Sequence, residues 1–148
     1  MAKKSELGKY LRKSGSTRKN PDPEVTANGI SMKSDAGFGN LNFALGCRAI
    51  TKPFYMVKTC HYHDFDQFLL FTGGDGTNMS DLGGVVELTL SKDGKKLEKF
   101  TITQATSVYI PAGMYHCPLN FKKVNDPKKP IIFHNLFFSN KYKKSHKK

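Results

Sequence analysis

The sequence predicts an all-β domain of the sandwich or barrel class, and three observations support this fold class. Short segments that alternate apolar and polar residues recur from residue 30 to residue 139, with turn residues between them. Helical periodicity is missing throughout this region. The chain has 148 residues, which is enough to bury one core, and it contains no internal repeat.

Nine strands are expected in this region. They span residues 30–34, 42–45, 54–63, 67–72, 85–91, 96–103, 107–110, 115–122 and 131–139. The tetrapeptide Ser91-Lys92-Asp93-Gly94 predicts a hairpin turn between the fifth and sixth of them. Regularly spaced strands of this kind favour a sandwich or a barrel.

The glycine-rich stretch 73–84 joins two of these strands. Five of its twelve residues are glycine. A loop that cradles phosphate needs a following helix, and the pattern that follows here is that of a strand. We therefore interpret the stretch as a long connection, with a lid as the alternative.

The basic residues are concentrated at the two ends of the chain. Residues 1–20 carry seven Lys or Arg and one Glu, and residues 141–148 carry five Lys, so only about +1 of the net charge of +12 falls between them. Few aromatic residues accompany these lysines, which argues against nucleic-acid binding and for solubilising segments. The expected organisation is a basic N-terminal extension (1–28), one domain (29–140) and a Lys-rich tail (141–148), with a short helix over 5–12 and a proline-containing linker near residues 20–23.

The composition also bears on location. The sequence has no apolar run long enough to span a bilayer and no signal-peptide pattern. Its three cysteines do not form the framework of a disulfide-rich secreted domain. We therefore expect a cytoplasmic protein without membrane contact.

The residues with the clearest chemistry lie in two separate segments. His61 and His63 are two residues apart on an expected strand, so both imidazoles point to one face. Gln67 follows after an acidic bend, and its amide oxygen is a candidate third ligand. His116 comes directly after a turn that contains proline and glycine. Three imidazoles and one oxygen donor suit Fe, Mn, Co, Ni, Cu or Zn.

With this combination the chain resembles the cupin superfamily. His61, His63, Gln67 and Gly74 match the first cupin motif, and Pro111, Gly113, His116 and Asn120 match the second. The resemblance covers roughly residues 29–142. It implies a double-stranded β-helix, which is a jelly-roll barrel, in a small single-domain cupin whose metal is bound by His61, His63, Gln67 and His116.

Three positions depart from the cupin pattern. Tyr55 and Ala105 stand where the leading glycines are expected, and Gln67 stands where a glutamate is usual. A neutral amide binds a hard divalent ion more weakly and leaves the site one positive charge richer. A hydrogen-bonding role for Gln67 beside a three-histidine metal is the alternative. Asp64 and Asp66 are expected to be solvated, and His134 to be structural or to line the pocket.

Strand alternation predicts the surroundings of the metal. The expected pocket residues are Val57, Thr59, Leu69, Phe71, Pro118 and Asn120. Such a pocket is largely apolar and suits a small organic molecule with one or two coordinating groups. Cys60 and Cys117 have the opposite parity, so we expect them on the outer face, where packing is favoured over a redox pair.

These features predict a metal-binding cupin that is a metal-dependent enzyme acting on a small organic molecule, of the dioxygenase, isomerase or decarboxylase type. The general acid or base is not identified. A non-catalytic small-molecule or metal-binding cupin is the first alternative, and a structural barrel without metal is the second. The resemblance also implies a homodimer, with residues 21–34 as a candidate exchanged arm.

Overall fold

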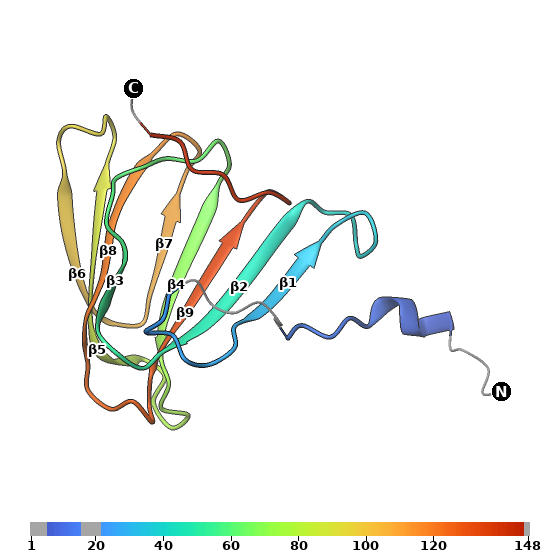
Figure 1. Cartoon of the computed structure of the whole chain (residues 1–148), viewed down its shortest axis with the longest axis horizontal. Coiled ribbons are helices and arrows are strands. Elements are labelled where there is room, and N and C mark those ends of the chain that lie inside the picture. Colours follow the sequence, from blue (N-terminus) through green and yellow to red (C-terminus); the bar gives the residue numbers. More distant parts are fainter. Residues whose placement is uncertain (1–5, 16–21, 147–148) are drawn as a thin grey trace.

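A computed structural model describes residues 6–15 and 22–146 and confirms the all-β prediction. Two antiparallel sheets form the domain (Figure 1). The first has the strand order β1-β2-β9-β4-β7 and the second β3-β8-β5-β6. The strands are β1 (Ile30–Ser34), β2 (Phe43–Ile50), β3 (Phe54–Val57), β4 (Gln67–Gly73), β5 (Asp81–Ser91), β6 (Glu98–Gln104), β7 (Thr106–Ile110), β8 (Tyr115–Val124) and β9 (Ile131–Phe137).

The core lies between the two sheets. In β4 every second residue is buried, and in β5 the inward residues Leu82, Val86 and Leu88 are almost completely buried. Phe71 from the first sheet and Phe121 from the second meet with ring centroids 6.2 Å apart. Each large apolar side chain buried in this way contributes roughly 1.5–3 kcal/mol. Alternation of apolar residues thus places one face of each sheet in a common core.

Three segments differ most from the expected strand bounds. The strand expected over 54–63 was wrong in its second half, because β3 ends at Val57 and does not reach His61 and His63. β2 continues to Ile50, and β5 begins at Asp81, so the predicted long connection at 73–84 was wrong and spans only 74–80. The glycines at its end lie in a strand because neighbouring backbones approach closely. A Cβ atom on Gly84 would overlap the carbonyl oxygen of Lys123 in β8.

The N-terminal segment is attached to the edge of the first sheet and then extends away from the domain (Figure 1). Its 3₁₀ helix, η1, spans Glu6–Tyr10, which is shorter than the helix expected over 5–12, and residue 5 lies outside the described residues. Ser31 donates a backbone hydrogen bond of 2.8 Å to Ser14, next to β1. Val25, which lies within the expected N-terminal extension 1–28, is buried in the core.

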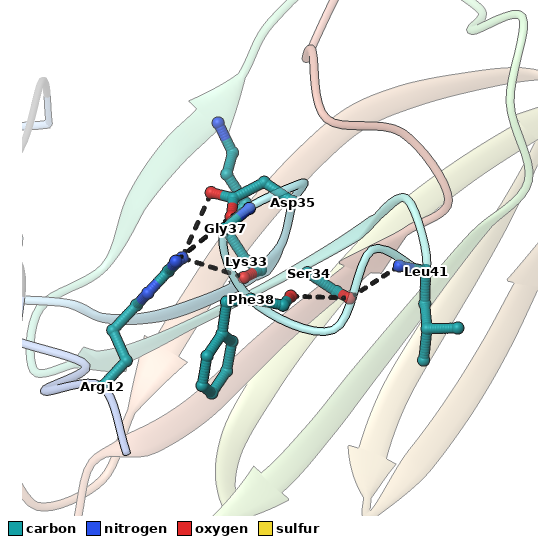
Figure 2. A network of polar contacts seen from close by, with 7 residues as sticks. All are labelled: Arg12, Lys33, Ser34, Asp35, Gly37, Phe38 and Leu41. Atoms are coloured by element: carbon teal, nitrogen blue, oxygen red, sulfur yellow. Dashed lines mark hydrogen bonds and ion pairs between the residues drawn. The ribbon is translucent and has the colours of Figure 1, made fainter. Parts of the chain in front are cut away.

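Arg12 fastens this segment to the turn between β1 and β2 (Figure 2). Its guanidinium donates to both carboxylate oxygens of Asp35, at 3.1 and 3.2 Å, and lies 4.6 Å from the centre of the Phe38 ring. Ser34 stabilises the same turn, because its hydroxyl donates to the Phe38 carbonyl and accepts from the Leu41 amide.

The expected basic extension, linker and tail fall partly outside the described residues. Residues 1–5, 16–21 and 147–148 lie outside the described residues, so the basic stretch 1–20 and the linker near 20–23 are only partly described. Within the described ranges, the helical segments are too short and too polar to cross a lipid bilayer.

Candidate metal centre

Three buried histidines gather at one end of the barrel. The candidate ligand atoms of His61, His63 and His116 all lie within 4.8 Å of one another. The ring centroids are 4.9 Å apart for His61 and His63, 4.3 Å for His61 and His116, and 5.0 Å for His63 and His116. At most 3% of each residue is exposed. Histidines from two distant segments therefore form a single cluster.

Backbone hydrogen bonds hold the two segments together. His61 lies beyond the end of β3 and pairs with His116 of β8, with N-to-O distances of 3.1 and 2.8 Å. The His63 carbonyl accepts a 2.7 Å hydrogen bond from the amide of Gly113. Gly113 has φ +83° in a turn closed by the Met114 amide and the Pro111 carbonyl, which explains a glycine at this position.

Asp66 connects the bend before β4 to the same turn. Its carboxylate accepts a hydrogen bond of 2.8 Å from the Ala112 amide, and its carbonyl accepts one of 3.1 Å from Phe138. A solvated side chain was expected at Asp66. The residue is exposed, as expected, but it also links three segments that surround the histidines.

The second ring nitrogen of each histidine determines which atom faces the centre. Nδ1 of His61 lies 3.1 Å from the Thr59 carbonyl, and Nδ1 of His116 lies 3.2 Å from the Met114 carbonyl. Nδ1 of His63 faces the carbonyl of Lys143. A carbonyl can only accept, so the proton is on Nδ1 in all three rings, and each Nε2 keeps its lone pair. Nε2 of His61 and of His63 is buried without a hydrogen-bond partner.

In the side chain of Gln67, as in His61 and His63, one polar atom is hydrogen-bonded and the other has no partner. It is the first residue of β4 and is 2% exposed. Its Nε2 donates a hydrogen bond of 2.7 Å to Oδ1 of Asn135 in β9, and its Oε1 is buried without a partner. Because the Nε2 contact fixes the amide orientation, Oε1 is an oxygen acceptor available to an ion. Orphaned buried acceptors of this kind are what a cation would satisfy.

Burial keeps these imidazoles neutral. Desolvation lowers the pKa of His61 to about 4 and that of His116 to about 3, and it also lowers the pKa of His63. The positive charge of Lys144 adds to the effect at all three rings. A metal ligand must be unprotonated, so the site is in its binding form at neutral pH.

The end of the chain crosses this cluster. Residues 141–146, called here the C-terminal strap, run across the upper end of the strands in Figure 1. Besides the contact between His63 and the Lys143 carbonyl, Tyr62 and Ser145 exchange two backbone hydrogen bonds of 2.9 Å. The His146 ring lies 6.0 Å from the His61 ring. The strap therefore belongs to the surroundings of the centre.

Tyr142 is the strap residue with the most contacts to the site. Its ring lies 4.8 Å from the His63 ring and 5.2 Å from the Phe137 ring. Its hydroxyl contacts the side chains of Gln67 and Asn135, and desolvation there raises its pKa to about 12. Because 45% of the residue is still exposed, Tyr142 lies at the boundary between the site and solvent.

The alternation expected after His116 does not hold in β8. Leu88 of β5 is opposite Leu119, but Leu90 is opposite His116, so β8 contains one extra residue there. This bulge puts Leu119 and Phe121 in the core on the same side as His116. Asn120 then lies on the other side and donates a 3.3 Å hydrogen bond to Glu87.

Because of the same bulge, the prediction for Cys117 was wrong. It was expected on the outer face, but it is 3% exposed and belongs to the core cluster, where burial raises the pKa of its thiol to about 12. Cys117 has φ +77°, which marks the departure from regular strand geometry. Cys60 is half-buried, and both thiols are free.

The other expected pocket residues have different surroundings. Leu69 and Phe71 are in the core, and Val57 packs against it. Pro118 is half-buried, whereas Thr59 is exposed and contributes its carbonyl to His61. His134 is opposite Leu70 and Cys47, on the outer side of the first sheet. Whether the pocket set contacts a ligand stays a prediction.

An apolar groove of about 390 Å³ lies near the centre along β5. Its lining includes Leu88, Leu90, Ile102 and Val108. Leu90, which lines the groove, is paired with His116 in the sheet, so the groove begins beside the histidine cluster. Its size and apolar lining suit a small organic molecule.

Comparisons with known proteins give matches in structure alone. No protein-family profile and no curated protein matches the chain. Among solved structures, oxalate decarboxylase from Bacillus subtilis, described with Mn(II) centres, gives a TM-score of 0.52 at 16% identity over 79% of this chain and 27% of that one. A second oxalate decarboxylase structure gives 0.55 at 16% identity, over 86% and 29%.

Vicilin from hazelnut, Corylus avellana, gives a TM-score of 0.57 at 13% identity over 90% of this chain and 34% of that one. This chain thus spans about a third or less of each of these proteins. Both kinds of protein are cupins, and identities this low carry information about the fold alone. The two-sheet domain of this protein has the cupin fold.

Proposed function

We propose that this protein is a metal-dependent cupin enzyme that acts on a small organic molecule. His61, His63, His116 and Gln67 hold a divalent transition metal ion. The reaction is of the dioxygenase, isomerase or decarboxylase type. The observation that supports this most directly is the convergence of three imidazoles whose Nδ1 protons are all turned toward carbonyls.

The donor set fits such an ion. Nε2 of His61, Nε2 of His63 and Oε1 of Gln67 are buried acceptors without partners, and an ion between them would satisfy all three. Nitrogen and neutral oxygen donors suit Mn, Fe, Co, Ni, Cu or Zn. When bound, the ion would act as a Lewis acid toward a coordinating oxygen of the substrate.

The charges around the centre favour an anionic substrate. All four proposed ligands are neutral, so the full charge of a divalent ion remains available to a carboxylate or enolate. Lys144 adds positive potential at each histidine. The likeness in fold to oxalate decarboxylase, a protein with Mn(II) centres, makes decarboxylation of a small acid a first reaction to assay.

The test begins with elemental analysis of protein purified without a metal-affinity tag. Wild type is expected to carry near-stoichiometric transition metal, and His61→Ala is expected to lose it. Asn120→Ala is the matched control, because Asn120 fits the cupin motif but contacts Glu87 away from the histidines. Wild-type protein that holds no metal and takes none up would overturn the proposal.

A non-catalytic binding protein is the second candidate, and the C-terminal strap favours it because the strap crosses the centre. Oxygen consumption and carbon dioxide release by the metal-loaded protein, with hydroxy acids, diketones and dicarboxylates, distinguish the two. Turnover that disappears in His116→Ala supports the enzyme. Saturable ligand binding without turnover, in wild type and in a chain that ends at Asn140, supports the binding protein.

A further inference from the structure

The apolar groove along β5 lies where the two sheets meet without pairing. β7 is the last strand of the first sheet and β6 is the last strand of the second, and these two described strands form no ladder with each other. The groove is lined by Leu88 and Leu90 of β5, by residues 100–104 of β6, and by Thr106 and Val108 of β7. Leu88 and Ile102 are buried, whereas Phe100 is 42% exposed. The groove therefore has a buried floor and a rim that is open to solvent.

In the second sheet the groove begins beside His116. Directly paired residues of an antiparallel sheet point to the same face, so the side chains of Leu90 and His116 are neighbours on the inner face. Leu88 is the next inward residue of β5, and it is paired with Phe100 of β6. Successive inward residues of β5 thus lead from a proposed metal ligand into the groove.

In the first sheet the groove approaches Gln67. Ile110 of β7 is paired with Gln67, and Val108, two residues earlier, is paired with Leu69. Ile110 and Leu69 belong to the core cluster, and Val108 packs against it. Because side chains two residues apart on a strand share a face, Val108 follows directly after the side chain beside Gln67. Both sides of the groove therefore lead to the proposed centre.

The lining of the groove is uncharged. Of its nine residues, all of which the structure describes, five are apolar, three are threonines and one is Gln104. On β6 the groove runs from Phe100 to Gln104, which corresponds to roughly 13 Å along a strand. Such a lining stabilises an apolar chain through burial, but it offers no counter-charge to an ionised group.

A second cavity, of about 190 Å³, has the opposite character. Its lining includes Asp75, Asp81, Asp126 and Lys129, and Lys129 already pairs with Asp75 at 2.7 Å. It lies beside the first residues of β5, whereas the histidines lie beside the last ones. Of these two cavities, only the groove combines an apolar lining with a position next to the proposed centre.

We infer that the ligand of the metal centre is an amphipathic monocarboxylic acid, whose medium-length alkyl chain lies in the groove and whose carboxylate faces the ion. This inference rests on the proposed function and narrows its substrate class. The four proposed ligands are neutral, so a divalent ion attracts a carboxylate. The groove accepts the uncharged remainder of the molecule. A dicarboxylate is less favourable, because its second charge would be desolvated beside the apolar lining without a partner.

Isothermal titration calorimetry with hexanoate, octanoate and decanoate tests the chain. Each fully buried methylene raises the affinity about fourfold. With wild type loaded with Co²⁺, the increase from hexanoate to decanoate is therefore expected to be at least about tenfold. Octanol has the same chain as octanoate but no carboxylate, and it is expected to bind about tenfold more weakly. Removal of Co²⁺ by a chelator is expected to abolish the difference between octanol and octanoate.

Two neighbouring residues of β7 provide a matched pair of variants. Val108 lines the groove, whereas Tyr109 points to the outer face of the same strand and is 52% exposed. Val108→Asp is expected to bring the ratio of decanoate to hexanoate affinity close to one, because a charge then lies beside the chain. Tyr109→Asp is expected to leave this ratio unchanged. Phe100→Asp, at the exposed rim, is a second groove variant, and thermal melts establish which variants are folded.

Elemental analysis before each titration separates this inference from the proposed function. Wild type that binds Co²⁺ but gains no affinity with chain length overturns the inference and leaves the metal centre in place. A gain that Val108→Asp and Phe100→Asp reduce no more than Tyr109→Asp does also overturns it, because the chain then binds outside the groove. Wild type that takes up no Co²⁺ overturns both proposals.

Discussion

The three histidines of the candidate centre are expected to lower the stability of the metal-free protein in acid. The folded pKa values of His61 and His116, about 4 and about 3, lie below the ordinary value of 6.5, so the unfolded chain binds more protons between these values. The contribution of these neutral imidazoles to the free energy of unfolding is therefore fully present above about pH 6.5, and it is lost as the pH falls toward 4. Denaturant midpoints of chelator-treated protein over this range measure the loss. In His61→Gln the decrease is expected to be shallower, and an equal decrease would contradict the assignment.

Gln67 is the residue at which a single charge can be added to the site. Gln67→Glu is expected to bind metal about tenfold more tightly, because a carboxylate is a stronger ligand than an amide, and tenfold corresponds to about 1.4 kcal/mol. Gln67→Leu keeps a similar volume but removes the oxygen, and it is expected to bind more weakly. Competition with a chromophoric chelator measures both. Equal affinities in the three proteins would show that Oε1 is not a ligand.

The bend between His63 and β4 is the element that connects the two halves of the centre. Asp66→Ala removes the hydrogen bond to the Ala112 amide and is expected to lower the free energy of unfolding by about 1 kcal/mol. Metal affinity should fall as well, since the turn that positions His116 loses an anchor. Asp64→Ala is the matched control in the same bend and should have little effect on stability. Urea unfolding of both variants measures the difference.

The contact between the two sheets determines the stability of the molecule as a whole. Phe121 is fully buried, and its ring centroid is 5.7 Å from that of Phe133 and 6.2 Å from that of Phe71. Phe121→Ala is expected to cost about 3–5 kcal/mol of unfolding free energy, because it leaves a cavity. Tyr55→Ala on the exposed side of β3 should cost much less. A small cost at Phe121 would mean that the core collapses around the cavity.

Local patterns in the sequence predicted the all-β class, and the resemblance to cupins added the barrel and the histidine cluster, but the prediction failed wherever a distant contact decides the structure. Two-residue spacing predicted His61 and His63 on one face, although neither lies in the strand that was expected there, and the turn before His116 predicted its place near the start of a strand. The contacts of Gln67 with Asn135 and of His63 with Lys143 join residues 68 and 80 positions apart, and no local pattern encodes them.

The bulge in β8 shows the same limit within one strand. A single extra residue between His116 and Leu119 reverses the side to which the side chains from Leu119 to Phe121 point, so Cys117 and Asn120 exchange their expected environments. The partner strand determines where such a residue is inserted, and its position depends on packing against β5. The first residue of β8 was predicted correctly, but alternation alone could not have located the extra residue.

A simple protease assay can report whether the C-terminal strap is in place over the centre. Trypsin cleaves after lysine, and the strap carries Lys141, Lys143 and Lys144, all exposed. The backbone on both sides of Lys144 is held by Lys143 against His63 and by Ser145 against Tyr62. A peptide bond held in this way must detach before a protease can bind it. The cleavage rate at these lysines therefore reports how often the strap leaves the histidines.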